Sequence, residues 1–213
     1  MNINNNSSAN QLLPGQDLRV GVDLIADKKD GALIVIGSTP KLDKISSGGI
    51  ILSDCNYSPE MLSELSKMDG AIVVDESVTK ILKANVHLNP SDTIATTQTG
   101  TRHRTAERTS VVTGLTVIAV SEETSLIKVF ENLETKELEE SSAILGRVNE
   151  SLQSVDRMRR RFDDAVTTLG ELEIENTLTN QEVLEVIQRG ELLTRLANQV
   201  KKEAFKLGED SSH

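Results

Sequence analysis

Short apolar runs alternate with helical patterns in the first two thirds of the chain. Between residue 17 and about residue 130, β-branched runs are separated by turn residues and by amphipathic segments, a pattern typical of α/β layer folds. Several runs are apolar throughout, as strands covered on both faces are. We expect strands at residues 32–37, 49–53, 71–75, 80–88, 116–121 and 125–130. Together they predict a central sheet covered by helices.

Three helices are expected between these strands. Residues 18–25 carry apolar side chains at helical spacing. Ser58 and Pro59 supply an N-cap and a first-turn proline for a helix that reaches residue 68. A third helix begins at Thr101 or the residue after it, and it ends before Gly114, which suits the left-handed position after a helix.

Beyond about residue 135 the pattern becomes purely helical. Apolar residues recur at steps of three and four from Leu138 to residue 169, and Thr179 and Glu182 form a capping-box pattern for a second helix. We therefore divide the chain into an α/β domain at residues 14–135 and a helical unit at 136–207. The polar ends, residues 1–13 and 208–213, are expected to be a disordered tail and a frayed tail.

The charge and the reactive side chains limit the possible functions. A formal net charge of −10 opposes general attraction to nucleic acid or to an anionic membrane, so an anionic ligand needs a local basic site. One cysteine and three histidines leave no cluster at zinc-ligand spacing. The apolar runs are far shorter than the roughly 20 residues of a bilayer-spanning helix, and the first ten residues do not resemble a signal peptide. We expect a cytoplasmic protein with no membrane partner.

The segment 99–108, Thr-Gly-Thr-Arg-His-Arg-Thr-Ala-Glu-Arg, is the most informative part of the chain. It places a glycine and three arginines at the expected start of a helix. The N–H groups and partial positive charge of a helix N-terminus attract anions, and arginine adds bidentate geometry. The segment therefore predicts a phosphate site, with a solvated basic helix start as the alternative.

A second segment, residues 67–71, puts Asp69 and Gly70 at the mouth of a buried strand. Ligand and catalytic groups concentrate at strand ends in α/β sheets, and a glycine lets a ligand approach the backbone closely. A carboxylate there could hold Mg²⁺ and help activate a hydroxyl. The alternative is an ordinary turn acid. The same Asp-Gly-Ala letters at residues 30–32 precede another strand, and we interpret Asp30 as structural.

Three stretches together resemble a known family. Residues 67–71 (Lys-Met-Asp-Gly-Ala), 84–88 (Ala-Asn-Val-His-Leu) and 99–108 are similar, in order and spacing, to the diadenylate cyclase domain of bacterial DNA integrity scanning proteins. The likeness covers roughly residues 14–135 and continues more weakly into the helical region. It implies a twisted mixed sheet flanked by helices, followed by an all-α unit.

The resemblance also implies site residues and an activity, the joining of two ATP molecules into cyclic di-AMP. Asp69 matches the position that binds the metal, Mg²⁺ or Mn²⁺, and activates the 3′-hydroxyl. The matching catalytic positions are Asp69, Arg102, His103 and Arg104, and the ATP-binding ones are Gly70, Ala71, Leu88, Thr101, Arg102, His103, Arg104, Thr105 and Ser121.

The resemblance further implies homo-oligomers, in which dimers within an octamer pair their nucleotide sites. The product contains two identical links, so a two-fold dimer that aligns two ATP molecules is the economical arrangement. Two departures qualify the transfer. Glu122-Glu123 stands where some relatives carry arginines, and the helix-hairpin-helix module that would bind DNA is absent from this chain.

Two other functions stay open. A non-catalytic sensor would hold ATP or cyclic di-AMP in the same fold, and an oligomerisation scaffold would use only the helical stripe. Of the remaining features, His87 is expected to be a packed strand residue and His103 a hydrogen-bonding rather than a metal-binding group. The basic cluster at residues 157–161 is expected to be a solvated helix face paired with nearby acids.

Overall fold

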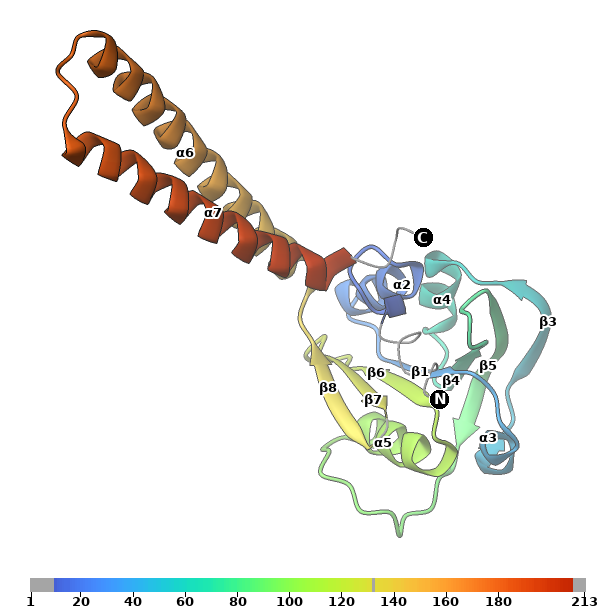
Figure 1. The fold of residues 1–213 in the computed structure, drawn as a ribbon. Coiled ribbons are helices and arrows are strands. Elements are labelled where there is room, and N and C mark those ends of the chain that lie inside the picture. The colour runs from blue at the N-terminus through green and yellow to red at the C-terminus, as the bar shows by residue number, and fades with distance from the viewer. Residues whose placement is uncertain (1–9, 132, 209–213) are drawn as a thin grey trace. The chain divides into compact units, whose positions relative to one another are not determined.

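The chain folds into two units, residues 1–140 and residues 141–213 (Figure 1). The structure, a computed structural model, describes residues 10–131 and 133–208, with side chains up to residue 201. The expected tails at residues 1–9 and 209–213 lie outside this range. The prediction of a disordered tail is wrong for residues 10–13, because Leu12 is buried in the core of the first unit.

Eight strands form one mixed sheet in the described part of the first unit. The order is β2-β5-β4-β1-β6-β7-β8, and β3 also pairs with β5. β1 and β4 are parallel and the remaining pairs are antiparallel. The predicted mixed sheet is confirmed. The strands are β1 (Ala32–Ile36), β2 (Ser46–Ser47), β3 (Ile50–Asn56), β4 (Ala71–Val74), β5 (Lys80–Leu88), β6 (Thr116–Val120), β7 (Ile127–Glu131) and β8 (Glu134–Leu138).

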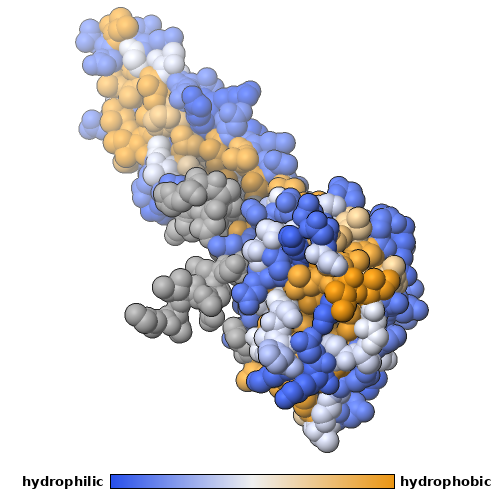
Figure 2. Space-filling model, turned by 90° about the vertical axis from the view of Figure 1, so that its right-hand side faces the viewer, coloured by the Kyte–Doolittle hydropathy of each residue, from blue (hydrophilic) through white to orange (hydrophobic). Residues whose placement is uncertain are grey.

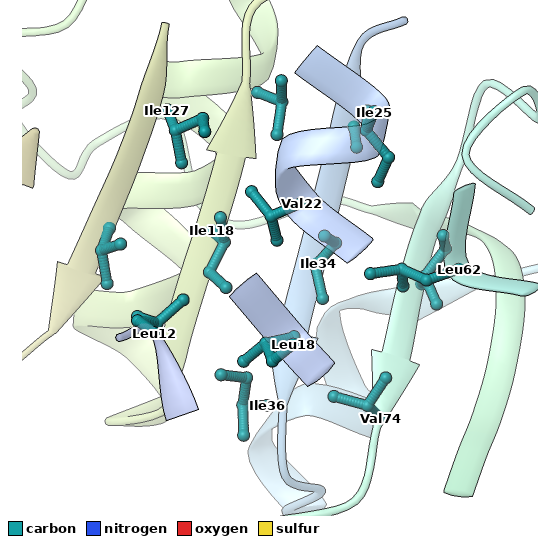
Figure 3. Close-up of a cluster of buried hydrophobic side chains, with 14 of the residues drawn as sticks. Leu12, Leu18, Val22, Ile25, Ile34, Ile36, Leu62, Val74, Ile118 and Ile127 are labelled. Carbon is teal, nitrogen blue, oxygen red and sulfur yellow. The ribbon is translucent and has the colours of Figure 1, made fainter. Parts of the chain in front are cut away.

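Helices cover both faces of this sheet and bury its apolar residues. α2 (Asp17–Asp27) and α4 (Pro59–Leu65) lie on one face, and α3 (Pro40–Ile45) and α5 (Thr101–Thr113) on the other (Figure 1). Figure 3 shows Leu18 and Val22 of α2 packed toward Ile34 of β1 and Ile118 of β6. The preceding residue of β1, Leu33, points to the opposite face. The uninterrupted apolar run of β1 therefore reflects burial on both sides.

The helix ends follow the capping signals in the sequence. The Ser58 hydroxyl accepts a hydrogen bond from the Met61 N–H at 3.1 Å, but α4 ends at Leu65, three residues earlier than expected. α5 has the predicted limits. Gly100 is its N-cap, and Gly114 adopts a left-handed conformation with a φ of 73° after its last turn.

The second unit is a pair of long helices, α6 (Ser141–Ile174) and α7 (Asn180–Gly208). The Thr179 N–H donates to Glu182 Oε2 at 2.7 Å, which confirms the capping box. Figure 2 shows apolar surface running along this pair. In the basic cluster, Arg160 pairs with Asp156 at 2.8 Å, as expected of a solvated face. None of the described helices is apolar over a stretch long enough to cross a membrane.

The prediction that Leu138 belongs to the apolar stripe of a helix is wrong. Residues 134–138 instead form β8, which is antiparallel to β7, and Leu138 packs against the core of the first unit. The α/β unit accordingly extends to residue 140 rather than to residue 135. A single leucine fits either pattern, and pairing with the preceding strand, β7, decides between them.

Candidate functional site

A cavity of about 770 Å³ opens at the N-terminus of α5, and its volume lies within the range of small-molecule sites. Its walls come from β1, β4, β5, the first turn of α5, and the turn and strand that follow β6. The sequence-predicted site residues that line it are Asp69, Ala71, Leu88, Thr101, Arg102, His103, Thr105 and Ser121. Gly70 and Arg104 are not among the lining residues.

Asp69 lies at the tip that leads into β4, and its side chain is exposed. The next residue, Gly70, has a role that the sequence did not reveal. A Cβ at Gly70 would lie 2.3 Å from the Asn85 carbonyl carbon and 2.5 Å from its Cα, so no side chain fits there. Asn85 itself has a φ of 54°, and the β4–β5 register shifts at this point. Gly70 therefore lets the backbone of β5 approach closely. The sequence instead predicts that this glycine makes room for a ligand.

The first turn of α5 concentrates positive charge at the cavity. It contains no acidic residue, and Gly100 supplies no side chain to cap the free N–H groups. Arg102 adds a guanidinium whose side chain is 31% exposed. A cation at a helix N-terminus is unfavourable in the absence of an anion, because the helix dipole already places partial positive charge there. The arrangement suits an anionic ligand such as a phosphate.

The surroundings of His103 disfavour its charged form. Burial lowers its pKa below the ordinary value of 6.5, and the positive charges of Lys128 and Arg102 lower it further. Its Nε2 atom is buried, and no residue within the described part of the chain hydrogen-bonds to it. A neutral imidazole with an unused nitrogen at a cavity wall can exchange a hydrogen bond with a ligand.

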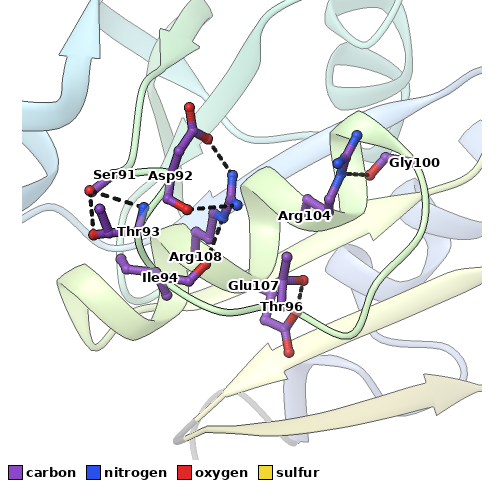
Figure 4. A network of polar contacts seen from close by, with 9 residues as sticks. All are labelled: Ser91, Asp92, Thr93, Ile94, Thr96, Gly100, Arg104, Glu107 and Arg108. Atoms are coloured by element: carbon purple, nitrogen blue, oxygen red, sulfur yellow. Dashed lines mark hydrogen bonds and ion pairs between the residues drawn. The ribbon is translucent and has the colours of Figure 1, made fainter.

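The loop of residues 89–100 connects β5 to α5 and is fixed by side chains of the helix (Figure 4). Arg108 donates to the Ile94 carbonyl at 3.0 Å, to the Asp92 carbonyl at 3.1 Å and to Asp92 Oδ1 at 2.5 Å. Thr96 donates to the carboxylate of Glu107. Both ends of this loop line the cavity, so Arg108 holds part of its wall rather than facing a ligand.

The turn after β6 brings opposite charges into the same cavity. The Ser121 hydroxyl accepts a hydrogen bond from the Thr124 N–H at 3.3 Å and so shapes this turn. Glu122 lies 3.9 Å from Arg102, measured from Oε2 to Nη1. On β7, Lys128 also faces the cavity, and its Nζ donates to Gln98 Oε1 at 2.9 Å.

A family model described as the nucleotide-binding domain of the DisA bacterial checkpoint controller matches residues 19–135, more than half of the chain. The chain belongs to this family. A second model, described as the DisA linker region, matches residues 138–212. The resemblance found in the sequence is thereby confirmed.

Curated relatives named DNA integrity scanning protein DisA match nearly the whole chain. The protein of Kineococcus radiotolerans is 44% identical over 93% of this chain, and that of Clostridium kluyveri 39% over 93%. The chain spans about half the length of these DisA relatives, 55% and 56% respectively. A solved structure, described as a hypothetical membrane spanning protein from Bacillus cereus, has a TM-score of 0.50 and 24% identity over 57% of this chain and 61% of that one. That likeness shows the fold alone.

Two cavity residues of this DisA-family domain were missed or misread in the sequence. His87 was expected to be packed in its strand, but its side chain is exposed and lines the cavity. Lys128 was not considered. Its neighbours in β7, Ile127 and Val129, both belong to the core on the α2 face. Strand alternation could therefore have assigned Lys128 to the face that α5 covers.

We predict that Gly70→Ala destabilises the ligand-free protein. The added methyl group would overlap the backbone of β5, and overpacking of this kind typically costs about 1–3 kcal/mol. Urea unfolding measures the change. Gly170→Ala in α6, where an added Cβ meets nothing within 4 Å, is the control. A Gly70→Ala protein as stable as the parent, yet impaired in ATP binding, would support the direct ligand role that the sequence suggested.

The lowered pKa of His103 makes a prediction about pH. The imidazole of His103 binds a proton more readily in the unfolded state than in the folded state. The contribution of His103 to the free energy of unfolding is therefore complete above its unfolded-state pKa and is lost as the pH falls below that value. The free energy of unfolding should therefore fall less steeply below about pH 6.5 in His103→Gln than in the parent. His87→Gln removes another imidazole from the cavity as a control. Parallel slopes for His103→Gln and the parent would contradict the assignment.

Arg108→Ala should loosen the loop of residues 89–100 without unfolding the sheet, because it removes three hydrogen bonds to Asp92 and Ile94. Hydrogen–deuterium exchange should show faster exchange at these residues, with the core strands unchanged. Arg104→Ala is the matched control, since Arg104 is exposed and its side chain donates a single hydrogen bond among the described residues, to the Gly100 carbonyl at 3.4 Å. Equal exchange in both variants would show that Arg108 does not hold the loop.

Proposed function

We propose that this domain is a diadenylate cyclase that joins two ATP molecules into cyclic di-AMP and releases two pyrophosphates. The observation that carries the proposal is one cavity lined by both Asp69 and the first turn of α5. In each step the 3′-oxygen of one ATP bonds to the α-phosphorus of the other. The bond from that phosphorus to the pyrophosphate oxygen breaks, and the proton of the 3′-hydroxyl passes to solvent. Membership of the DisA nucleotide-binding family supports the substrate class.

Asp69 is the group proposed to receive the metal and to favour deprotonation of the 3′-hydroxyl. No cluster of three or more His, Cys, Asp or Glu side chains suited to a metal occurs among the described residues. A single exposed carboxylate fits Mg²⁺ or Mn²⁺ that arrives with the nucleotide, because Mg²⁺ is commonly held by one or two carboxylates together with substrate phosphates. When bound, such an ion would supply charge neutralisation at the phosphates.

The start of α5 is proposed to hold the phosphates. The free N–H groups of Thr101 and the next residues, together with the Arg102 guanidinium, would stabilise the charge that develops on the departing pyrophosphate. Arg104 is exposed at the same turn and could reach phosphates that extend out of the cavity. Neutral His103 would hydrogen-bond a phosphate or ribose oxygen without adding charge. Leu88 and Ala71 offer apolar contact to the nucleoside.

The symmetry of the product implies that the active form is a dimer. Each proposed site holds one ATP, so a face-to-face pair of domains would align both attacks. We also propose assembly into a larger homo-oligomer, up to an octamer, and a cytoplasmic location. DNA binding is proposed only for a module outside this chain.

A second candidate function, a nucleotide sensor without turnover, is favoured by one observation. Glu122 faces Arg102 from within the same cavity, at 3.9 Å. A carboxylate at this position opposes the approach of a phosphate, and it lies in the segment where some relatives carry arginines. A sensor would bind ATP or cyclic di-AMP and leave ATP unconverted. The scaffold alternative requires no cavity and has no such support.

The test is incubation with ATP and Mg²⁺ or Mn²⁺ at several protein concentrations, with products identified by mass. We expect cyclic di-AMP, and a specific activity that rises with protein concentration because the dimer is required. Asp69→Asn should keep the fold and lose turnover by at least about a hundredfold, the scale of losses on removing a single group that acts in the transition state. ATP binding without product in the parent would favour the sensor. Full turnover in Asp69→Asn would contradict the role of Asp69.

A further inference from the structure

Gly31, at the junction between α2 and β1, lies directly against the guanidinium of Arg102. A Cβ built on Gly31 would be 2.2 Å from Nη1, 2.5 Å from Cζ and 2.8 Å from Nη2 of Arg102. Its three nearest atoms all belong to this one group. The guanidinium therefore occupies the space that any side chain at position 31 would need.

Arg102 is bounded on another side by the carboxylate of Glu122. The distance from Nη1 to Glu122 Oε2 is 3.9 Å, longer than a hydrogen bond, and Glu122 is the single ionic partner of Arg102 in the part of the chain that the structure describes. Steric contact with Gly31 and a loose ion pair thus define where the guanidinium lies. Its N–H groups are left available to a ligand in the cavity.

A long arginine side chain has several rotamers, and holding it in one of them lowers the entropy lost when a ligand binds. We propose that Gly31 is a positioning residue which, by lacking a side chain, seats the Arg102 guanidinium at the cavity wall. The inference rests on the proposed role of Arg102 in holding ATP phosphates. With this role for Gly31, the Asp-Gly-Ala sequence at residues 30–32 contributes its glycine to the site. Asp30 is still interpreted as structural.

Gly31→Ala separates the position of the arginine from its charge. The overlapping atoms are the far end of a flexible side chain, so the added methyl group can be accommodated by rotation of Arg102 away from the cavity wall. The fold is retained and the charge remains on the protein. Only the direction of the Arg102 N–H groups changes.

The experiment is a double-mutant cycle of the parent, Gly31→Ala, Arg102→Ala and the combined variant, with two measurements on each protein. Urea unfolding without ligand tests the contact. Gly31→Ala should lower the free energy of unfolding more in the parent than in the Arg102→Ala background, where the guanidinium no longer occupies the space beside residue 31. Calorimetric titration with ATP and Mg²⁺ tests the function. Gly31→Ala should weaken ATP binding about tenfold in the parent and less than about twofold in the Arg102→Ala background.

Each outcome decides between explanations. A purely structural role for Gly31 would weaken ATP binding equally in both backgrounds, and it would overturn the proposal. Additive unfolding energies would show that the contact with Arg102 is absent and would also overturn it. If the parent binds no ATP while the unfolding energies are coupled, the proposed function fails and the contact has no role in nucleotide binding. Gly146→Ala, where an added Cβ meets nothing within 4 Å, should leave ATP affinity unchanged.

Discussion

The packing of α5 against the sheet is the constraint on which the site depends. Its buried side consists of small residues, among them Ala106, Thr109 and Ser110, and the Ser110 hydroxyl donates to the Phe130 carbonyl of β7 at 3.0 Å. Small side chains let the helix lie close to the strands, which brings its first turn to the edge of the sheet near Asp69. The helix N-terminus, which attracts anions, and the carboxylate at a strand tip then act within one cavity. Either feature alone would be an ordinary surface group.

Much of the fold was readable because single residues carried local signals. The apolar runs predicted the buried strands, and Gly100 and Gly114 predicted both ends of α5, although its buried side is not strongly apolar. What could not be read depended on contacts that one segment makes with another. The strand β8 exists because it pairs with β7, and the requirement for Gly70 comes from the approach of β5. The family resemblance named site residues, but local sequence contains nothing to indicate that Gly31 adjoins Arg102.

The charges in the cavity bear on ATP binding under both of the functions considered. Arg102, Lys128 and the start of α5 favour a polyphosphate, whereas Glu122 opposes one. Asp69 and Glu123 also line the cavity, so a polyphosphate there depends on the free N–H groups of α5 and on a divalent metal as well as on the two cationic side chains. Glu122 is 67% exposed, so solvent screens its charge and its side chain is free to turn away. Binding of ATP is therefore expected under both functions. The proposed turnover further requires Asp69 and a second subunit to align the 3′-hydroxyl with the α-phosphorus.

In the proposed function, Asp69 and the first turn of α5 hold the same nucleotide. The most direct test is a crystal structure of this protein with Mg²⁺ and an ATP analogue in which a methylene group replaces the oxygen between the α- and β-phosphates. We expect phosphate oxygens at the N–H groups after Gly100 and at Arg102, with the metal between these phosphates and the Asp69 carboxylate. An analogue bound with its phosphates away from α5, or with Asp69 distant from both metal and nucleotide, would contradict it.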